Sequence, residues 1–374
     1  MEFIIKREYL LKSLLRVQGV TEKKMIMPVL ENVLMEVKLN KMYFTATDLE
    51  VGIHGSIEVE VIKEGKCALL AKKVLEIVRE LSGNEVSLIL KESLAGAGSL
   101  ELLCGSAIFN INTTDPEEYP SIPIYEDVDL FDINSEKIRN MIRKTIYAAS
   151  TDEKKKNING VFFEKDGKTI RMVGTDGHRL SIIEEDNTES IDLSFKKGVL
   201  FPIKGLNELK KILDEDKEDD KISFGFAGNN AIFKTSSILM IIRLMDSQFP
   251  DYTMFIPKDQ NKRFVINRDR FLKSLKRVSL FSGGVSKSVK LHISQEKIEM
   301  TASSTDYGEA YDEIEVDYKD DELTVAFNAR YFIEALGVID SEEVLVELKD
   351  CKSGAVVKPV GDDKHKCIVM PMEI

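Results

Sequence analysis

The stretch VGTDGHRLSI (173–182) carries residue types that often occur together in active sites. Asp176 could hold a proton, His178 could act as a general base, and Arg179 could stabilise an anion. A hydrolase that uses Asp176 and His178 is therefore one hypothesis. The other is a binding site, in which this polar edge lies beside the apolar Leu180 and no bond is made or broken.

A catalytic interpretation needs a nucleophile or a metal ion, and the sequence supports neither. It contains no GxSxG, HExxH or P-loop motif. The histidines are scattered, and His365 with Cys367 is too small a group for a metal site. We therefore predict no catalytic residue, no metal and no cofactor. The cysteines show no CxxC spacing, which favours reduced structural thiols.

Internal repeats identify the elements that must position this stretch. Segments 1–17, 129–147 and 262–278 each predict a short strand followed by an amphipathic helix. Strand-rich segments follow at 30–53, 158–182 and 288–310, and a strand with a second helix follows at 68–81, 198–213 and 323–339. The alternation of apolar and acidic residues in IEVEVI (57–62) and EIEVDY (313–318) is typical of strands with one buried face.

Each repeat predicts an α+β unit, in which an antiparallel sheet carries both helices on one face. Proline and charge interrupt the pattern near 125 and 255, so we expect similar domains at 1–125, 126–254 and 255–374. In this alignment Asp48, Asp176 and Asp306 are equivalent, whereas the His-Arg pair occurs once. Asp176 is therefore expected to be a turn residue that accepts hydrogen bonds from nearby backbone N–H groups.

The predicted helices carry basic residues away from their apolar stripes. Arg139 and Arg143 lie on one helix, and Lys273 and Lys276 on another. Further basic residues on the helices are Lys12, Arg16, Lys72, Lys73, Lys137, Lys144, Lys204, Lys210, Lys211 and Arg277. They could form separate solvated faces, or, because repeated units place helices on a common side, one basic surface.

The totals exclude some classes of protein. No segment approaches the roughly 20 apolar residues of a membrane span, and the start MEFIIKREYL is too charged for a signal peptide. We therefore expect a cytosolic protein. The net charge of −12 at first argues against a nucleic-acid partner. A duplex responds to the local face that it meets, however, so a basic inner surface and an acidic exterior are compatible with this total.

The whole chain resembles the bacterial sliding clamp, the beta subunit of DNA polymerase III. The resemblance rests on TDGHRLS (175–181), FPDY (249–252), the pattern of Phe327, Asn328 and Tyr331, and VMPMEI (369–374). It implies the DNA clamp fold, with antiparallel sheets outside and two helices of each domain lining the inside of a ring-shaped, head-to-tail homodimer. Such a ring encircles double-stranded DNA without reading its sequence. It tethers DNA polymerase subunits, repair proteins and the clamp loader through a short linear motif.

Simple geometry agrees with this expectation. Twelve helices, each about 10 Å across, would leave a hole roughly 28 Å wide when they stand side by side in a circle. A duplex passes through such a hole with loose contacts, mostly to phosphates. The function implied is a non-catalytic processivity factor of DNA replication. The hydrolase above and a scaffold of repeated domains that never meets DNA remain the alternatives.

The resemblance also implies a partner-peptide cleft between the second and third domains. Its residues are Ile158, Thr175, Gly177, His178, Arg179, Leu180, Pro250, Met254, Phe255, Asn328, Tyr331, Ile368, Met370, Pro371 and Met372. Methionine is adaptable, which suits a site with several partners; alternatively, the Met-Pro-Met segment is a last strand that closes the third core. Glu373, Ile374, Met254 and Ser286 depart from the family pattern, so the preferred peptide is expected to differ.

Two further surfaces follow from the pattern and the resemblance. Lys23, Lys24, Lys154, Lys155 and Lys156 fall on loops that the family turns toward DNA, and Lys196 and Lys197 precede a strand of the second repeat and are also expected to face DNA. The alternative is that these are simply exposed loop lysines. An edge strand within 100–111, with Phe109 and Ile111 as apolar anchors, is expected to pair with the third unit of a second copy. By resemblance, Leu280 and Phe281 contribute to that interface. The alternative is that Phe109 and Ile111 belong to their own core.

Overall fold

The structure is a computed structural model, and it describes residues 1–21, 27–91, 98–123, 125, 128–186, 198–215, 220–283 and 287–373. The chain forms two compact units. The first unit consists of Met1–Glu136 and Lys204–Leu244, and the second of Lys137–Ile203 and Met245–Ile374. The predicted domain 126–254 contributes to both units, so its boundaries stay a prediction.

Each predicted pair of strand and helix is present. The first pairs are β1 (Glu2–Lys6) with α1 (Arg7–Thr21), β10 (Leu130–Asn134) with α3 (Ser135–Thr145), and β18 (Lys262–Asn267) with α5 (Arg268–Ser279). The second pairs are β6 (Gly65–Leu70) with α2 (Ala71–Glu80), β14 (Val199–Pro202) with α4 (Ile203–Glu215), and β22 (Leu323–Asn328) with α6 (Ala329–Val338). Asparagine side chains cap two of these helices, because Asn267 and Asn328 accept hydrogen bonds from the N–H groups of Arg270 and Arg330.

Two sets of three strands complete every repeat. The set between the helices comprises β2 (Asn32–Lys38), β3 (Lys41–Thr47) and β4 (Val51–Glu58); β11 (Gly160–Asp166), β12 (Thr169–Thr175) and β13 (Arg179–Asp186); and β19 (Ser288–Ser294), β20 (Lys297–Ser304) and β21 (Gly308–Glu315). The set after the second helix comprises β7 (Glu85–Lys91), β8 (Ser99–Cys104) and β9 (Ala107–Asn112); β15 (Lys221–Ala227), β16 (Asn230–Lys234) and β17 (Ile238–Arg243); and β23 (Glu343–Leu348), β24 (Ala355–Pro359) and β25 (His365–Val369).

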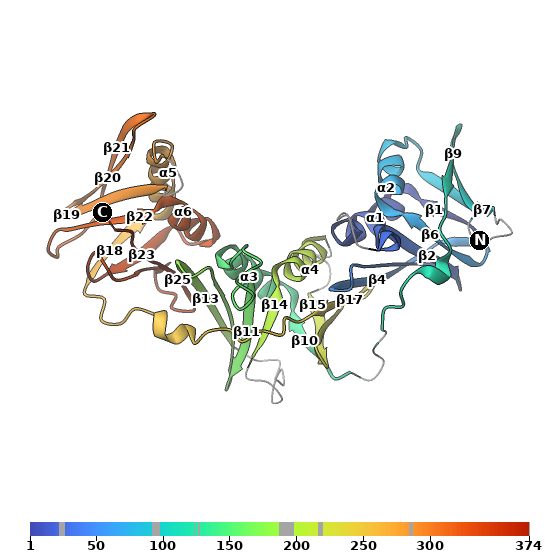
Figure 1. Ribbon diagram of the computed structural model, residues 1–374, viewed down its shortest axis with the longest axis horizontal. Helices are drawn as coiled ribbons and strands as arrows, with labels where there is room; N and C mark the ends of the chain where they lie inside the picture. The colour runs from blue at the N-terminus through green and yellow to red at the C-terminus, as the bar shows by residue number, and fades with distance from the viewer. Residues whose placement is uncertain are drawn as a thin grey trace. The chain divides into compact units, whose positions relative to one another are not determined.

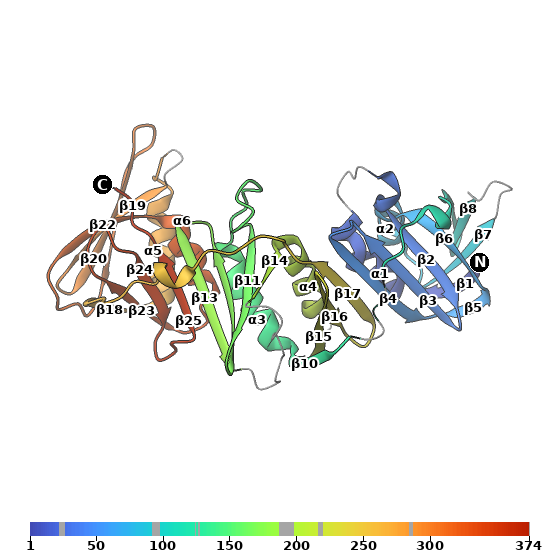
Figure 2. The same ribbon diagram turned by 60° about the horizontal axis from the view of Figure 1, so that its bottom comes forward.

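Strand pairing joins consecutive repeats (Figure 2). In the first unit, the sheet β10-β15-β16-β17-β4-β3-β2-β6 joins two repeats where β17 pairs with β4. In the second unit, the sheet β14-β11-β12-β13-β25-β24-β23-β18 does so where β13 pairs with β25. The last strand of the set between the helices in one repeat therefore pairs with the last strand of the next repeat. This rule leaves β9, at the edge of β5-β1-β7-β8-β9, and β21, at the edge of β21-β20-β19-β22, without such a partner.

The helices of a repeat pack against each other, as α1 with α2 and α5 with α6 (Figure 1). The apolar stripe of α5 is buried as predicted, at Phe271, Leu275 and Val278. Phe271 meets Phe332 of α6 edge to face, with ring centroids 5.9 Å apart, and Phe332 meets Phe327 at 4.8 Å. Both helices thus share one core with the four-stranded sheet.

Several basic residues of the helices are not on an exposed face. Arg16 and Lys144 are only 8% and 7% exposed. Arg16 lies 3.4 Å from a carboxylate oxygen of Glu215, and Lys204 forms an ion pair with Asp48. The expectation that Arg16, Lys144 and Lys204 project outward is therefore wrong, because their own unit buries or neutralises them.

The segment IEVEVI (57–62) also differs from the expectation of one strand. It is divided between β4, which ends at Glu58, and β5 (Glu60–Lys63), and these strands belong to different sheets. Val59 lies between the two strands, and its N–H donates to the Asn40 carbonyl at 3.1 Å. Alternation continues through the segment although the partner strands change, so the sequence pattern could not reveal the division.

Candidate functional site at the junction of β13 and β25

Asp176 is a turn residue between β12 and β13, as predicted. Its Oδ1 atom accepts hydrogen bonds from the N–H groups of His178 at 2.9 Å and Arg179 at 3.1 Å. Thr175 Oγ1 donates to the Arg179 carbonyl at 2.6 Å and accepts from the Gly177 N–H at 3.1 Å. Gly177 has φ of 92°, which favours glycine. The Asp176 carboxylate, which a hydrolase would need, is thus engaged in hydrogen bonds that form the turn.

The first repeat forms the same turn from Thr47 and Asp48. Asp48 Oδ1 accepts hydrogen bonds from the N–H groups of Glu50 at 2.9 Å and Val51 at 2.6 Å. Thr47 Oγ1 accepts one from the Leu49 N–H at 3.0 Å. Because the turn recurs without a histidine or an arginine, its geometry serves the fold.

The third repeat departs from the predicted alignment. The hairpins β11–β12 and β19–β20 both turn through two residues, after Asp166 and after Ser294, so Ser304 holds the place of Asp176. The N–H group of Asp306 donates to Ser304 Oγ at 3.2 Å, as that of His178 does to Asp176 Oδ1. The predicted equivalence of Asp306 with Asp176 is therefore wrong, because the paired residues Lys297 and Glu315 enclose one residue more than the paired Thr169 and Asp186.

Arg179 holds this turn against α6. It is 7% exposed, and its Nε lies 3.1 Å from an Asp176 carboxylate oxygen. It also pairs with Glu334 and donates to the Tyr147 carbonyl. The guanidinium carbon lies 5.2 Å from the ring centroid of Tyr147 and 4.7 Å from that of Tyr331. The sequence motif predicted Arg179 as a site residue, whereas Tyr147 and Glu334 were missed because no motif marks them.

Glu334 connects the turn to a second cation on α6. Arg330 Nε lies 2.7 Å from its carboxylate. Burial favours the neutral form, but the hydrogen bonds from Arg179 and Arg330 hold the pKa of Glu334 below its usual value. The charged carboxylate therefore holds the Arg179 side chain in place. Beside it, the exposed His178 ring stacks on the Tyr331 ring, with ring centroids 6.5 Å apart.

An apolar cluster lies beside the turn, within the second unit. Leu180 in β13 is the cross-strand partner of Ile368 in β25, and they are 4% and 2% exposed. The other buried members are Val173, Leu200, Phe249, Tyr252 and Val356; Ile158, Phe162, Met245 and Ile256 pack around them partly exposed. The cluster therefore joins strands of two repeats with the segment that connects them.

That connecting segment, drawn in yellow in Figure 2, is fixed to the sheet by its aromatic residues. Phe249 stacks on Phe162 with ring centroids 4.9 Å apart. The Tyr252 hydroxyl donates to Glu164, and burial together with this carboxylate raises the pKa of Tyr252. The short helix η4 (Tyr252–Phe255) then presents Met254 and Phe255, which are 79% and 58% exposed. Exposed apolar side chains beside a buried apolar cluster can bind a partner.

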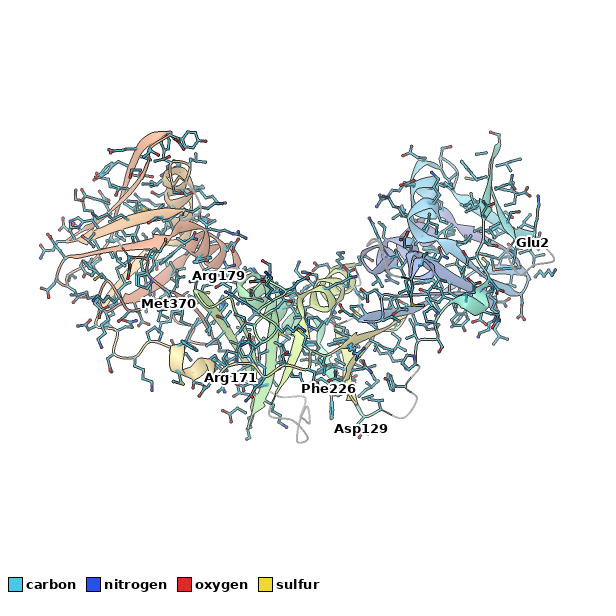
Figure 3. All side chains as sticks on the ribbon, in the orientation of Figure 1. Glu2, Asp129, Arg171, Arg179, Phe226 and Met370 are labelled. Atoms are coloured by element: carbon cyan, nitrogen blue, oxygen red, sulfur yellow. The ribbon has the colours of Figure 1, made fainter. Side chains whose placement is uncertain are left out.

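The C-terminal residues border the same cluster. The Met370 N–H donates to the His178 carbonyl at 2.9 Å, and Figure 3 labels Met370 near Arg179. A Cβ atom placed on Gly354 would lie 3.0 Å from Ile368 and 3.1 Å from the Met370 sulfur. The Met372 N–H donates to the Ala326 carbonyl at 2.8 Å. Met-Pro-Met therefore follows the last strand, β25, and is not that strand.

The residues predicted for the cleft thus lie in several places. The structure places Ile158, Leu180 and Ile368 in the cluster, and Thr175, Gly177, His178, Arg179, Met370 and Tyr331 around the turn. Pro250, Met254 and Phe255 lie on the connecting segment, and Asn328 caps α6. Pro371 and Met372 are partly exposed. Ser286 and Ile374 lie outside the described residues. Phe249 and Tyr252 were missed as site residues, although FPDY contains both.

Behind the site, β13 and β25 enclose a small polar group. Ser181 Oγ donates to the Lys144 carbonyl at 2.6 Å, and the Tyr147 hydroxyl lies 3.1 Å from the Cys367 sulfur. Burial lowers the pKa of His365 to about 3 and raises that of Cys367. A buried thiol of this kind is inert. All four cysteines are described and none forms a disulfide.

The residues predicted to face DNA have different environments. Lys273 and Lys276 are exposed on α5, and Lys154, Lys155 and Lys156 are exposed before β11. Arg139 lies on α3, and Arg143 forms an ion pair with Asp340 at 2.5 Å. Lys23, Lys24, Lys196 and Lys197 lie outside the described residues. These DNA contacts stay a prediction.

The predicted edge strand is β9, as the sheet order requires. Ile111 is 8% exposed and belongs to its own core, whereas Phe109 is half-buried. Leu280 is 76% exposed and Phe281 packs partly against the third repeat. The interface role of Phe109, Ile111, Leu280 and Phe281 therefore stays a prediction.

The described side chains give no support to catalysis or metal binding. No group of three metal-ligating residues occurs among them. Asp176 is occupied by the turn and by Arg179, and the apolar cluster offers no reactive group. In the part of the chain that the structure describes, no helix has the length and hydrophobicity to cross a membrane. What this arrangement can do is bind an apolar segment beside a fixed cation.

Comparison with known proteins identifies the class. Models of the N-terminal, central and C-terminal domains of the DNA polymerase III beta subunit match residues 1–123, 132–251 and 253–373. The beta sliding clamps of Pseudomonas aeruginosa and Haemophilus influenzae are each 30% identical, with 100% of both chains covered. The crystal structure of the Thermotoga maritima beta subunit is 28% identical with a TM-score of 0.91, covering 100% of this chain and 99% of that one.

The three repeats thus define a sliding clamp, with three clamp domains of antiparallel sheets and few helices. The chain belongs to the DNA polymerase III beta subunit family. The predicted fold class and the function in DNA replication are confirmed. This family is the non-catalytic subunit, so the hydrolase hypothesis is wrong.

Proposed function

We propose that two copies of this chain close a ring around duplex DNA and hold replication polymerases on it. The observation that carries this proposal is the pairing rule. At two junctions the last strand of the set between the helices pairs with the last strand of the next repeat. Strands β21 and β9 are the strands of these two kinds without such partners. One chain that offers both edges pairs head to tail with a second copy.

We propose that partner peptides dock on the apolar cluster between β13 and β25. The buried Leu180 and Ile368 form its base, and the exposed Met254, Phe255 and Met370 are available to cover a peptide. Arg179 is held by two carboxylates, so the site keeps one shape. The DNA-facing surface includes Lys273 and Lys276 of α5, which are exposed. A cytoplasmic location follows from a role in replication.

Topological retention tests the ring. The chain is loaded on nicked circular DNA with the clamp loader of the source organism and ATP, and free protein is removed by gel filtration. We expect the protein to stay on circles and to leave after a restriction enzyme linearises them, because only an encircling ring escapes at ends. A linear duplex blocked at both ends by streptavidin should retain it. Equal retention on open linear DNA would refute encirclement.

Peptide binding tests the cluster. The probe is a fluorescein-labelled peptide of leucines and one aspartate, read by anisotropy. Phe255→Ser should weaken binding about 5- to 30-fold, because the ring loses apolar burial worth roughly 1–2 kcal/mol. Leu39→Ser is the matched control, since Leu39 is 78% exposed in the other unit. Equal affinity in both variants would remove Phe255 from the site.

A further inference from the structure

A pocket lies at the other junction between repeats, in the first unit. It has a volume of about 340 Å³, within the range of ligand sites. Its walls come from the turn after β3, the segment Ser121–Pro123, and strands β16 and β17. The lining residues used below are Leu49, Glu50, Gly52, Ile122, Ile241 and Arg243. Nothing in the proposed function uses this pocket.

The strand register shows that this pocket is the counterpart of the cluster at β13 and β25. Gly52 pairs with Ile241 across β4 and β17, as Leu180 pairs with Ile368 across β13 and β25. The Arg243 N–H donates to the Glu50 carbonyl at 2.7 Å. The Met370 N–H donates to the His178 carbonyl at 2.9 Å. Arg243 and Glu50 therefore hold the places of Met370 and His178.

The connecting segments correspond as well. Tyr119-Pro120-Ser121-Ile122 follows the last strand of the first repeat, as Phe249-Pro250-Asp251-Tyr252 follows that of the second. Ile122 thus holds the place of Tyr252. A Cβ atom on Gly52 would lie 3.2 Å from an Ile122 methyl carbon, so Ile122 reaches over the position where Leu180 lies in the other site.

The differences between the sites predict different ligand chemistry. The base has Gly52 where the other site has Leu180. The apolar residues that line the pocket are then Ile122 and Ile241, with Leu49 and Pro123. Arg243 brings a cation to the place of the thioether of Met370. Arg243 is exposed, and within the described ranges its guanidinium has no hydrogen bond or ion pair, Glu50 included. An exposed cation beside apolar side chains favours a carboxylate next to an apolar group.

We infer that the pocket at the junction of β4 and β17 is a second peptide site, which takes an apolar side chain between Ile122 and Ile241 and the neighbouring carboxylate on Arg243. The class of ligand rests on the proposed function, whereas the position of the second site rests only on the strand register of β4 with β17 and on the pocket. Each chain then offers two sites of related shape. A partner with two short apolar and acidic segments could occupy both at once.

Methyl NMR of the whole protein tests this inference. Isoleucine δ1 methyl groups are labelled with ¹³C, and acetyl-Leu-Asp-Leu-amide is added. Ile122 and Ile241 report on the second site, and Ile158 and Ile368 report on the site at β13 and β25. We expect both pairs of methyl signals to shift, with separate saturation curves. Arg243→Glu should weaken the curve of Ile122 and Ile241 at least tenfold and leave the other pair unchanged.

Controls separate this inference from the proposed function. Lys234→Glu makes the same change of charge at an exposed position of β16, and both curves should stay as in the native protein. Acetyl-Leu-Asn-Leu-amide, which lacks the carboxylate, should bind more weakly only at the site of Ile122 and Ile241.

Shifts confined to Ile158 and Ile368 would overturn the second site and leave the proposed one standing. Shifts confined to Ile122 and Ile241 would support the second site and contradict the proposed one. Shifts at Ile122 that persist in Arg243→Glu would overturn the role of Arg243, and no shift anywhere would overturn both sites.

Discussion

Replacing Asn110 by proline should open the proposed ring without unfolding the chain. Hydrogen bonds alternate along an antiparallel pair. The Thr113 N–H donates to the Gly98 carbonyl at 3.0 Å, so alternate residues back along β9, Ile111 and Phe109, bond inward to β8. The Asn110 N–H therefore points to the free edge. Proline there removes a bond to a second copy but none within the sheet.

The magnitude follows from that bond. Losing it costs about 1 kcal/mol net, and the carbonyl left unpaired in β21 of the partner adds about 1–3 kcal/mol. The proposed head-to-tail ring closes twice, so the dimer loses about 4–8 kcal/mol in total. The dimer dissociation constant should therefore rise by at least about 500-fold. Phe109→Asp is a poorer test, because Phe109 is half-buried in its own sheet and its loss would disturb the unit itself.

Sedimentation velocity over a dilution series measures this change. Asn110→Ala keeps the N–H group, so its dissociation constant should match the native value. Thermal melting followed by circular dichroism should show that Asn110→Pro is folded at the temperature of the experiment. A folded Asn110→Pro protein whose dissociation constant stays within tenfold of the native one would refute pairing through β9.

Three further predictions concern charge. Burial lowers the pKa of His365 from 6.5 to about 3, so the unfolded state binds the extra proton in this interval. Stability should therefore fall as pH drops below 6.5, by about 2 kcal/mol at pH 5, and urea unfolding should show no such contribution in His365→Gln. Arg179→Met should destabilise the chain by roughly 1–3 kcal/mol in urea, since it removes the charged hydrogen-bond donor of the partly buried Asp176 and Glu334 carboxylates, and Arg179→Lys should recover only part. Lys273→Glu with Lys276→Glu should weaken DNA binding and reduce its salt dependence by about two counterions, whereas Lys290→Glu, on an exposed position of β19, should not.

Periodicity predicted the elements because each strand and helix has one buried face. The stripe of Phe271, Leu275 and Val278 made α5 evident, and the strand before it ends at the capping Asn267. The division of 57–62 between two sheets was not predictable, since a strand keeps its alternation when its partner changes. The displacement of Asp306 was missed for a related reason. A loop can gain one residue without altering the strands that flank it.

The site could be predicted only where a residue type marks its role. Asp176 was assigned to a turn because aspartate accepts backbone N–H groups there. Tyr147, Glu334 and Phe249 lie far from TDGHRLS in sequence and meet it only through folding. Lys144 was wrongly expected to be exposed. Its position away from the apolar stripe of the helix does not reveal that another element covers it.

Duplication explains why the two junctions have the same form and different chemistry. The pairing of β4 with β17, and of β13 with β25, fixes where four positions lie: the last residue before the strand, the second strand residue, its cross-strand partner, and the residue two places after that partner. One junction fills them with His178, Leu180, Ile368 and Met370, and the other with Glu50, Gly52, Ile241 and Arg243. Backbone hydrogen bonds maintain the shape in both, so the side chains are free to change without loss of the fold. Peptide preference should therefore follow these four residues at each junction.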